Sequence, residues 1–265
     1  MVRLFLSAYR SETNDALDIN HLGGFSASTT EYIDHFAGLD ASELSQDEIN
    51  YYRPRVNRDF ALSRRDPVFV KIHDAYTYFG GTPLIPTQGT LGVIYLIRNP
   101  LDIVKSYANH YGMGITNAID DMDNPELTIG TIQKDQVEQR LMTWSGHVTS
   151  WTEATPFPVM TLRYEDLLMN THETYCSLIR FSGLPYDENR MKIALDQTQF
   201  ENLRKQEQNG GFNEKPMKSV AFFRRGKVGG YRDELTQAQI RQVIDTHGPL
   251  MKRFGYIDEK GVPLF

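Results

Sequence analysis

Short apolar runs alternate along the chain with longer stretches in which apolar residues recur every three or four positions. Three of the short runs predict β-strands, at Val68–Ile72, Gly92–Ile97 and Val159–Arg163. The run Gly92–Ile97 carries branched and aromatic side chains without polar alternation, as is typical of a strand buried on both faces in a parallel sheet. A helical or loop segment follows each strand, so the pattern indicates an α/β fold.

The longer stretches predict helices. Val2, Phe5, Leu6 and Tyr9 are spaced i, i+3, i+4 and i+7, which predicts an amphipathic helix, and we expect its beginning to be cut off. Five further helices are predicted at Leu101–Tyr111, Lys134–Glu153, Asn170–Ser182, Arg190–Leu203 and Thr236–Phe254. Neither a Pro/Gly/Ser-rich linker nor a repeat divides the chain, so we expect residues 1–265 to form one domain.

Charge and composition exclude some classes of protein. The net charge of −6 argues against a general nucleic-acid or membrane surface. The apolar stretch between Arg3 and Arg10 is too short to span a membrane and lacks a signal-peptide cleavage pattern, so we expect a cytoplasmic protein. No His/Cys/Asp cluster has the spacing of metal ligands, and we predict no metal.

Arg98-Asn99-Pro100 directly follows the run Gly92–Ile97. Pro is well tolerated in the first turn of a helix, so a helix is expected to begin here. Ser106 stands eight positions after Arg98, two helical turns on, which lets a guanidinium and a hydroxyl converge on one phosphate. Arg supplies a planar fork of donors and the helix start adds its dipole. The pattern predicts an anion site, and a plain structural turn is the alternative.

These residues resemble the sulfotransferase family, in which a strand, Arg-Asn-Pro and a Ser eight residues after the Arg bind the 3′-phosphate of the donor, 3′-phosphoadenosine 5′-phosphosulfate (PAPS). Three further segments match in order. Val68–His73 resembles the strand ending in Lys-x-His, Leu162–Leu167 the Tyr-Glu-Asp strand end, and Phe222–Arg232 the late Arg-Lys-Gly-x-x-Gly-Asp-Trp-Lys loop. The resemblance implies a three-layer, P-loop-NTPase-like α/β fold with a central parallel sheet flanked by helices.

The resemblance also implies a role for each matching residue. His73 would be the catalytic base, because an imidazole with a reference pKa of about 6.5 accepts a proton near neutrality. Lys71, two residues earlier on the same strand face, would neutralise charge on the leaving phosphate. The donor would be held by Arg98, Ser106, Tyr164, Thr198, Phe200, Leu203, Arg224, Arg225 and Gly226.

The late loop departs from the family pattern. Gly230, Tyr231 and Arg232 stand where the family has Asp, Trp and Lys. Phe200 belongs to a weaker match and could be a core residue, and the Arg224-Arg225 pair could be a solvated basic loop.

Some polar residues near these motifs are expected to have other roles. Glu165 and Asp166 are expected to cap the helix that follows them. His110 and His147 are expected on the surface or on a helix face rather than as second catalytic groups.

One family segment is missing. Members open with a strand and a loop of the type Tyr-Pro-Lys-Ser-Gly-Asn-Thr-Trp that holds the 5′-phosphosulfate, and no such loop precedes the helix that starts near Met1. No Gly-x-x-x-x-Gly-Lys-Ser/Thr replaces it elsewhere. We therefore expect a sulfotransferase domain without its first strand and phosphate loop, either trimmed from a longer protein or a natural short form.

The expected function is transfer of a sulfuryl group from PAPS to a hydroxyl or amine of a small-molecule acceptor, at a pocket lined by Tyr76–Pro86, His110–Gly130 and Phe212–Phe223. The first alternative is a noncatalytic relative that binds the product nucleotide, adenosine 3′,5′-bisphosphate (PAP), or a protein partner. The second is another nucleotide-dependent phosphotransferase. The sequence leaves a homodimer open.

Overall fold

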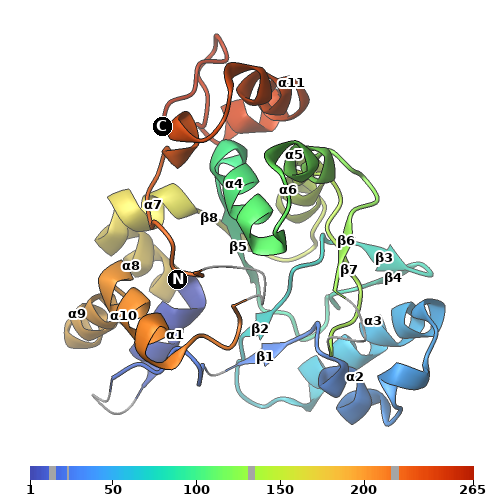
Figure 1. Cartoon of the computed structure of the whole chain (residues 1–265). Coiled ribbons are helices and arrows are strands. Elements are labelled where there is room, and N and C mark those ends of the chain that lie inside the picture. Colours follow the sequence, from blue (N-terminus) through green and yellow to red (C-terminus); the bar gives the residue numbers. More distant parts are fainter. Residues whose placement is uncertain (12–15, 23, 131–134, 216–220) are drawn as a thin grey trace.

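A computed structural model of the chain describes residues 1–11, 16–22, 24–130, 135–215 and 221–265. Two predicted segments extend outside these ranges: the helix expected at Lys134–Glu153 starts at residue 134, and the expected acceptor segment Phe212–Phe223 includes residues 216–220. The described chain runs from α1 (Val2–Arg10) at lower left in Figure 1 to α11 (Gln237–Arg253) at the top.

Two pairs of parallel strands form the frame of the fold. β5 (Val93–Ile97) pairs with β8 (Val159–Arg163), with Val93 opposite Val159 and Ile97 opposite Arg163. β1 (Phe25–Ser26) pairs in parallel with β2 (Val70–Lys71). Parallel neighbours need long crossover connections, and helices supply them here, which confirms the predicted α/β class.

The described strands are divided among four two-stranded sheets, whereas one central sheet was predicted. The other two pairs are antiparallel: β3 (Tyr78–Phe79) with β4 (Thr82–Pro83), and β6 (Thr128–Ile129) with β7 (Gln139–Arg140). β5 was expected to be buried on both faces, but in the described chain it pairs only with β8, and its Leu96 is 44% exposed. The strand expected at Val68–Ile72 is shorter, because β1 offers it only two partner residues, and His73 follows β2 instead of lying on it.

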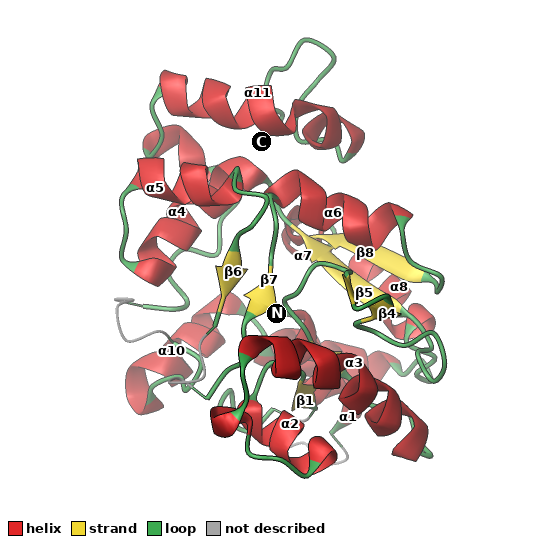
Figure 2. Cartoon of the chain, turned by 90° about the vertical axis from the view of Figure 1, so that its right-hand side faces the viewer, coloured by secondary structure: helices red, strands yellow, loops and turns green. Residues whose placement is uncertain are grey.

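Helices cover both faces of the β5–β8 pair (Figures 1 and 2). Ile94, Met160 and Leu162 pack into a hydrophobic cluster with α1, α8 (Thr171–Phe181), α9 (Glu188–Gln197) and α10 (Phe200–Gly210). Tyr95 and Ile97 pack into a second cluster with α4 (Pro100–Tyr111), α5 (Ile115–Met122), α6 (Trp144–Glu153) and α11. Successive strand residues face opposite sides, so the pair is the middle of three layers.

A third cluster lies beside β1, at lower right in Figure 1. It joins α2 (Thr30–Ala37), the 3₁₀ turn η1 (Ala41–Glu43) and α3 (Gln46–Ser63). Among the described helices, none is both long and apolar enough to cross a membrane.

Most predicted helices are confirmed, but two are corrected. The first half of the helix expected at Lys134–Glu153 contains β7, and α6 begins only at Trp144, where the Thr143 hydroxyl accepts a hydrogen bond from the Gly146 amide at 2.8 Å. The helix expected at Arg190–Leu203 is split into α9 and α10, because the Gln199 backbone is extended (ψ 140°). The hydrophobic spacing hid this break, since both helices bury residues in the same cluster.

Candidate active site

The turn from β5 into α4 is built as the sequence predicted. Asn99 is fully buried, and its side-chain oxygen accepts a hydrogen bond from the Leu101 amide at 3.1 Å, which caps α4. Pro100 occupies the first turn of the helix, where the missing N–H removes no hydrogen bond. The turn therefore holds Arg98 rigidly at the carboxyl end of β5, and Ser106 lies exposed two turns along α4.

Glu165 fastens this turn to the next strand end. Its carboxylate accepts a hydrogen bond from the Asn99 amide at 3.0 Å, and burial raises its pKa. Asp166 instead forms two hydrogen bonds with the Arg163 guanidinium, at 2.8 and 2.6 Å. Both residues lie in the first turn of the following helix, α7 (Tyr164–Met169), as expected, but neither forms a side-chain cap hydrogen bond in the described chain, because Asn99 and Arg163 use their carboxylates.

Arg98 lies against Tyr164, which follows the neighbouring strand β8. The guanidinium carbon is 4.5 Å from the centre of the Tyr164 ring, a cation–π contact. The Arg98 Nε is buried and has no hydrogen-bond partner in the described part of the chain. A buried donor without a partner is costly, so this corner favours a ligand that brings an acceptor oxygen.

The late loop docks on α4 beside this corner. Asp102 accepts hydrogen bonds from the amides of Gly229 at 2.8 Å and Tyr231 at 3.0 Å, which holds the loop and the 3₁₀ turn η3 (Gly230–Asp233) against the helix start. Arg224 and Arg225 both pair with Glu234, each at 3.1 Å. The basic loop is therefore tethered to the protein body and is not freely solvated.

Gly226 brings two of the predicted donor residues into contact. Its φ of 60° is left-handed, and a Cβ there would lie 2.4 Å from the ring of Phe200. Only glycine allows this approach. Two other residues predicted to hold the donor, Thr198 and Leu203, are largely internal. The Thr198 hydroxyl donates to the Ala194 carbonyl at 2.6 Å, and Leu203 lies in the core.

A second cluster of charges surrounds the end of β2. The Glu214 carboxylate bridges two cations, with one oxygen 2.9 Å from the Lys71 Nζ and the other 2.7 Å from an Arg3 guanidinium nitrogen. Partial desolvation by the surrounding protein and the positive charge of Lys71 lower the pKa of His73, which is still exposed, to about 4. His73 is therefore neutral at physiological pH, the state in which an imidazole can accept a proton.

Arg3 and Glu214 were not predicted as site residues. His147 lies on a helix face, on α6, as expected, but it is half-buried, and its Nε2 is 3.0 Å from the main-chain oxygen of His73. Its spacing on α6 gave no signal of this contact, because the partner is a backbone atom far away in sequence.

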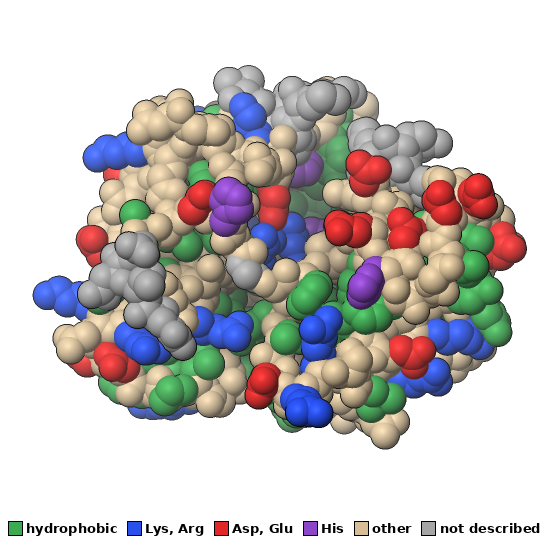
Figure 3. All heavy atoms as spheres, turned by 90° about the horizontal axis from the view of Figure 1, so that it is seen from below, with side chains coloured by type: hydrophobic (Ala, Val, Ile, Leu, Met, Phe, Trp, Pro, Cys, Tyr) green, Lys and Arg blue, Asp and Glu red, His purple; other side chains and the backbone are tan. Residues whose placement is uncertain are grey.

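The predicted site residues form two clusters, one at the end of β2 and one at the ends of β5 and β8. Lys71 is the last residue of β2 and His73 lies just after it, while Arg98 and Tyr164 directly follow β5 and β8. Ligands of parallel sheets bind at such carboxyl ends. Seen from below, the surface has a hollow near its middle, with basic, acidic and His side chains around it (Figure 3).

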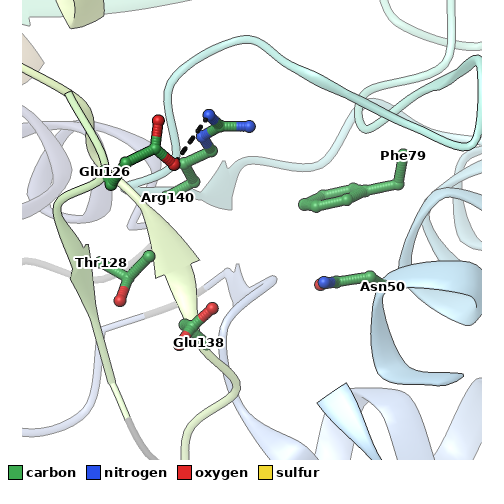
Figure 4. A pocket seen from close by; sticks show the side chains of 6 residues that line it. All are labelled: Asn50, Phe79, Glu126, Thr128, Glu138 and Arg140. Atoms are coloured by element: carbon green, nitrogen blue, oxygen red, sulfur yellow. Dashed lines mark hydrogen bonds and ion pairs between the residues drawn. The ribbon is translucent and has the colours of Figure 1, made fainter. Parts of the chain in front are cut away.

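A polar cavity of about 170 Å³ lies between α3, β3 and the β6–β7 pair (Figure 4). Its lining residues are Asn50, Phe79, Glu126, Thr128, Glu138 and Arg140. Arg140 and Glu126 form an ion pair at 3.4 Å on its β6–β7 side, opposite Phe79 and Asn50 (Figure 4). The cavity adjoins the segment after His73, because the Ala75 amide donates to the Arg140 carbonyl at 2.7 Å.

Comparison with known proteins places this architecture in a family. The family model described as the sulfotransferase domain matches residues 34–255, and the chain therefore belongs to the sulfotransferase family. Sulfotransferase 1E1 of Bos taurus is 27% identical over 161 residues, covering 58% of this chain and 52% of the relative. Sulfotransferase 1A1 of Mus musculus is also 27% identical, covering 58% of this chain and 53% of the relative. The chain thus spans about half the length of these relatives.

Solved structures agree on the fold. The crystal structure of mouse sulfotransferase SULT7A1 complexed with PAP superposes with a TM-score of 0.53 and 18% identity, covering 98% of this chain and 91% of that chain. Retinol dehydratase in a complex with retinol and PAP gives a TM-score of 0.58 and 17% identity, covering 95% of this chain and 76% of that chain. The P-loop-like sulfotransferase fold predicted from the motifs is confirmed, while the role of each site residue stays a prediction.

Proposed function

We propose that this protein transfers a sulfuryl group from PAPS to a hydroxyl or amine of a small-molecule acceptor, with His73 as the base. The observation that carries the proposal is the position of Lys71 and His73 together at the carboxyl end of the parallel strand β2. A base and a cation at one strand end are what a charge-separating transfer needs. Family membership supports the reaction class.

In the proposed reaction the acceptor oxygen or nitrogen forms a bond to sulfur, and the bond from sulfur to the phosphate oxygen breaks. The acceptor proton passes to the unprotonated ring nitrogen of His73. PAP leaves with the bonding electron pair, and Lys71 offsets the charge that develops on its phosphate. No oxidant, reductant or metal is needed for this balance.

Arg98 and the late loop fit the 3′-phosphate end of the donor. The buried Arg98 Nε lacks an acceptor, and Asp102 holds the loop carrying Arg224, Arg225 and Gly226 against the start of α4. Several main-chain amides and cations beside one helix start suit a phosphate. Tyr164 and Phe200 would contact the adenine, because each presents a ring beside one of these groups.

The cavity in Figure 4 is the proposed acceptor pocket. Phe79 comes from the expected segment Tyr76–Pro86, and Glu126 and Thr128 come from His110–Gly130. The remaining walls are mostly polar, so the cavity favours a compact acceptor bearing several polar groups over an extended apolar one. Such an acceptor and a nucleotide donor are consistent with the expected cytoplasmic location.

The test is sulfuryl transfer from radiolabelled PAPS to a panel of phenols, sugars and amines, with His73→Ala as the comparison. Transfer that His73→Ala abolishes is the expected result. Binding of PAP without transfer to any acceptor would favour the noncatalytic alternative. Failure to bind PAPS or PAP would contradict both the proposed sulfuryl transfer and the noncatalytic binding of PAP.

A further inference from the structure

His147 on α6 lies between the end of β2 and strand β5. Its Nε2 is 3.0 Å from the His73 main-chain oxygen, and its Nδ1 is 2.9 Å from the Tyr95 hydroxyl. The rings of Tyr95 and His147 are stacked, with centres 5.7 Å apart and an angle of 21° between their planes. Tyr95 also stacks on Trp151, so packing on both sides holds the phenol in place.

The two hydrogen bonds define one tautomer of His147. A carbonyl oxygen can only accept, so the Nε2 facing His73 must carry the proton. Nδ1 is then the acceptor, and the Tyr95 hydroxyl donates to it. Burial raises the pKa of Tyr95 and lowers the pKa of His147, so both groups stay neutral. The Tyr95 hydroxyl then still donates to Nδ1, and Nε2 still donates to the His73 carbonyl.

The backbone after His73 is held by several partners. The Trp151 indole donates to the Asp74 carbonyl at 2.9 Å, and the Asp74 carboxylate is bound by the buried Arg53. The Ala75 amide donates to the Arg140 carbonyl. His147 holds the one carbonyl in this stretch that belongs to His73 itself, so it restrains the peptide plane next to the imidazole.

We propose that His147, in the tautomer that the His73 carbonyl requires and the Tyr95 hydroxyl supports, is a positioning residue for His73. It fixes the main chain of His73, and through it the direction of the imidazole, without touching the reacting atoms. This inference rests on the proposed function of His73 as the base. The simpler interpretation is that His147, Tyr95 and the His73 backbone only pack together. Removing the His147 or Tyr95 polar groups would then lower the stability of the protein and leave the direction of the His73 imidazole unchanged.

Three substitutions separate these readings. His147→Leu removes the donor to His73, whereas His147→Gln keeps an amide donor near the same place. Tyr95→Phe removes only the hydroxyl that donates to Nδ1. The His73 carbonyl alone then favours the proton on Nε2, so the tautomer protonated at Nδ1, whose Nε2 repels that carbonyl, becomes more populated. Tyr175→Phe is the matched control, since this buried hydroxyl has no hydrogen-bond partner in the described residues.

The expected kinetic result is a loss in kcat. His147→Leu and Tyr95→Phe should each lower kcat by roughly 10- to 100-fold with little change in KM for the donor, because misplacing a catalytic group by about 1 Å costs that much. His147→Gln and Tyr175→Phe should stay near the parent value. In the His147→Gln background, Tyr95→Phe should have no further effect, because the donor of glutamine does not depend on a tautomer.

Two kinetic results would overturn the proposal. One is a normal kcat in folded His147→Leu. The other is an equal loss from Tyr95→Phe in both backgrounds, which would mean that the hydroxyl acts independently of His147. If His147→Leu does not fold, the effect of Tyr95→Phe on kcat in the parent protein is compared with its effect in His147→Gln, and this comparison tests the positioning role.

Histidine NMR provides a readout that does not need activity. The ¹⁵N shifts should show His147 protonated at Nε2 in the parent protein and shifted toward Nδ1 protonation in Tyr95→Phe. The ring signals of His73 should be single in the parent and broadened or doubled in His147→Leu and Tyr95→Phe. If the parent protein transfers no sulfuryl group, the proposed function fails, and unchanged His73 signals in these variants would separately overturn the positioning role.

Discussion

Asp74→Asn should strongly destabilise the protein, because Asp74 neutralises a buried arginine. Its carboxylate accepts hydrogen bonds from the Arg53 guanidinium at 3.1 and 2.6 Å and from the Arg140 amide at 3.0 Å. The side chains of Arg53 and Asp74 are 1% and 0% exposed. The substitution keeps the shape but removes the charge, so Arg53 is left buried without a counter-charge.

The size of the effect follows from the burial. Removing one partner of a buried ion pair costs about 3–5 kcal/mol. Coulomb's law gives a similar value, about 4 kcal/mol for charges about 4 Å apart at an effective dielectric constant of about 20. Folded proteins are stable by only about 5–15 kcal/mol in total, so a large share of the stability of this chain should be lost.

Urea unfolding at pH 7, followed by tryptophan fluorescence, measures this loss. Trp151 is a suitable reporter because its indole donates to the Asp74 carbonyl. The matched control is Asp59→Asn, whose partner Arg58 is 53% exposed, and it should change the unfolding free energy by less than about 0.5 kcal/mol. A second variant, Arg53→Met in the Asp74→Asn background, should recover part of the loss. A loss below about 1 kcal/mol for Asp74→Asn would refute the reasoning.

Three other outcomes follow from the contacts. Glu214→Gln should raise the affinity for PAP about three- to tenfold, because the Glu214 carboxylate competes with the ligand for Lys71. Calorimetry measures this affinity, and an unchanged value would contradict the prediction. Gly226→Ala should weaken PAP binding and lower the urea midpoint of unfolding, because the alanine Cβ would collide with the Phe200 ring and the backbone φ at this position is left-handed. Normal binding and stability would show that the loop adapts to the substitution. Burial lowers the pKa of His247 to about 4, so between about pH 6.5 and 4 the unfolded state binds more protons than the folded state. The folded protein should therefore lose stability as the pH is lowered through this window, by at most about 1.4 kcal/mol per pH unit. His247→Gln should reduce this slope in urea titrations at pH 7, 6 and 5, and equal slopes would disprove the assignment.

The segments whose structure is decided locally were predicted well. The run before Arg98 is strand β5, and Pro100 begins α4. These features depend on residues within one or two turns of each other, so the printed sequence contains their causes. The motif-based family assignment succeeded for the same reason.

Predictions failed where distant contacts override local pattern. Helical spacing runs through residues 137–148, yet Gln139 and Arg140 form strand β7, because residues 128–129 offer them a ladder partner. The Glu165 carboxylate was expected at a helix cap but binds the amide of Asn99, 66 positions away. Tertiary partners decide such cases because a hydrogen bond inside the protein outweighs a weak local preference.

The sequence by itself determined the class of protein, the α/β plan and the strand ends that carry Lys71, His73, Arg98 and Tyr164, because these are properties of short motifs and periodic segments. Only the tertiary structure decided the surroundings that set their chemistry. It paired Lys71 with Glu214, surrounded His73 with groups that lower its pKa to about 4, and placed His147 on the His73 carbonyl. Burial and contacts between residues more than 70 positions apart depend on how the layers pack, which no local pattern specifies.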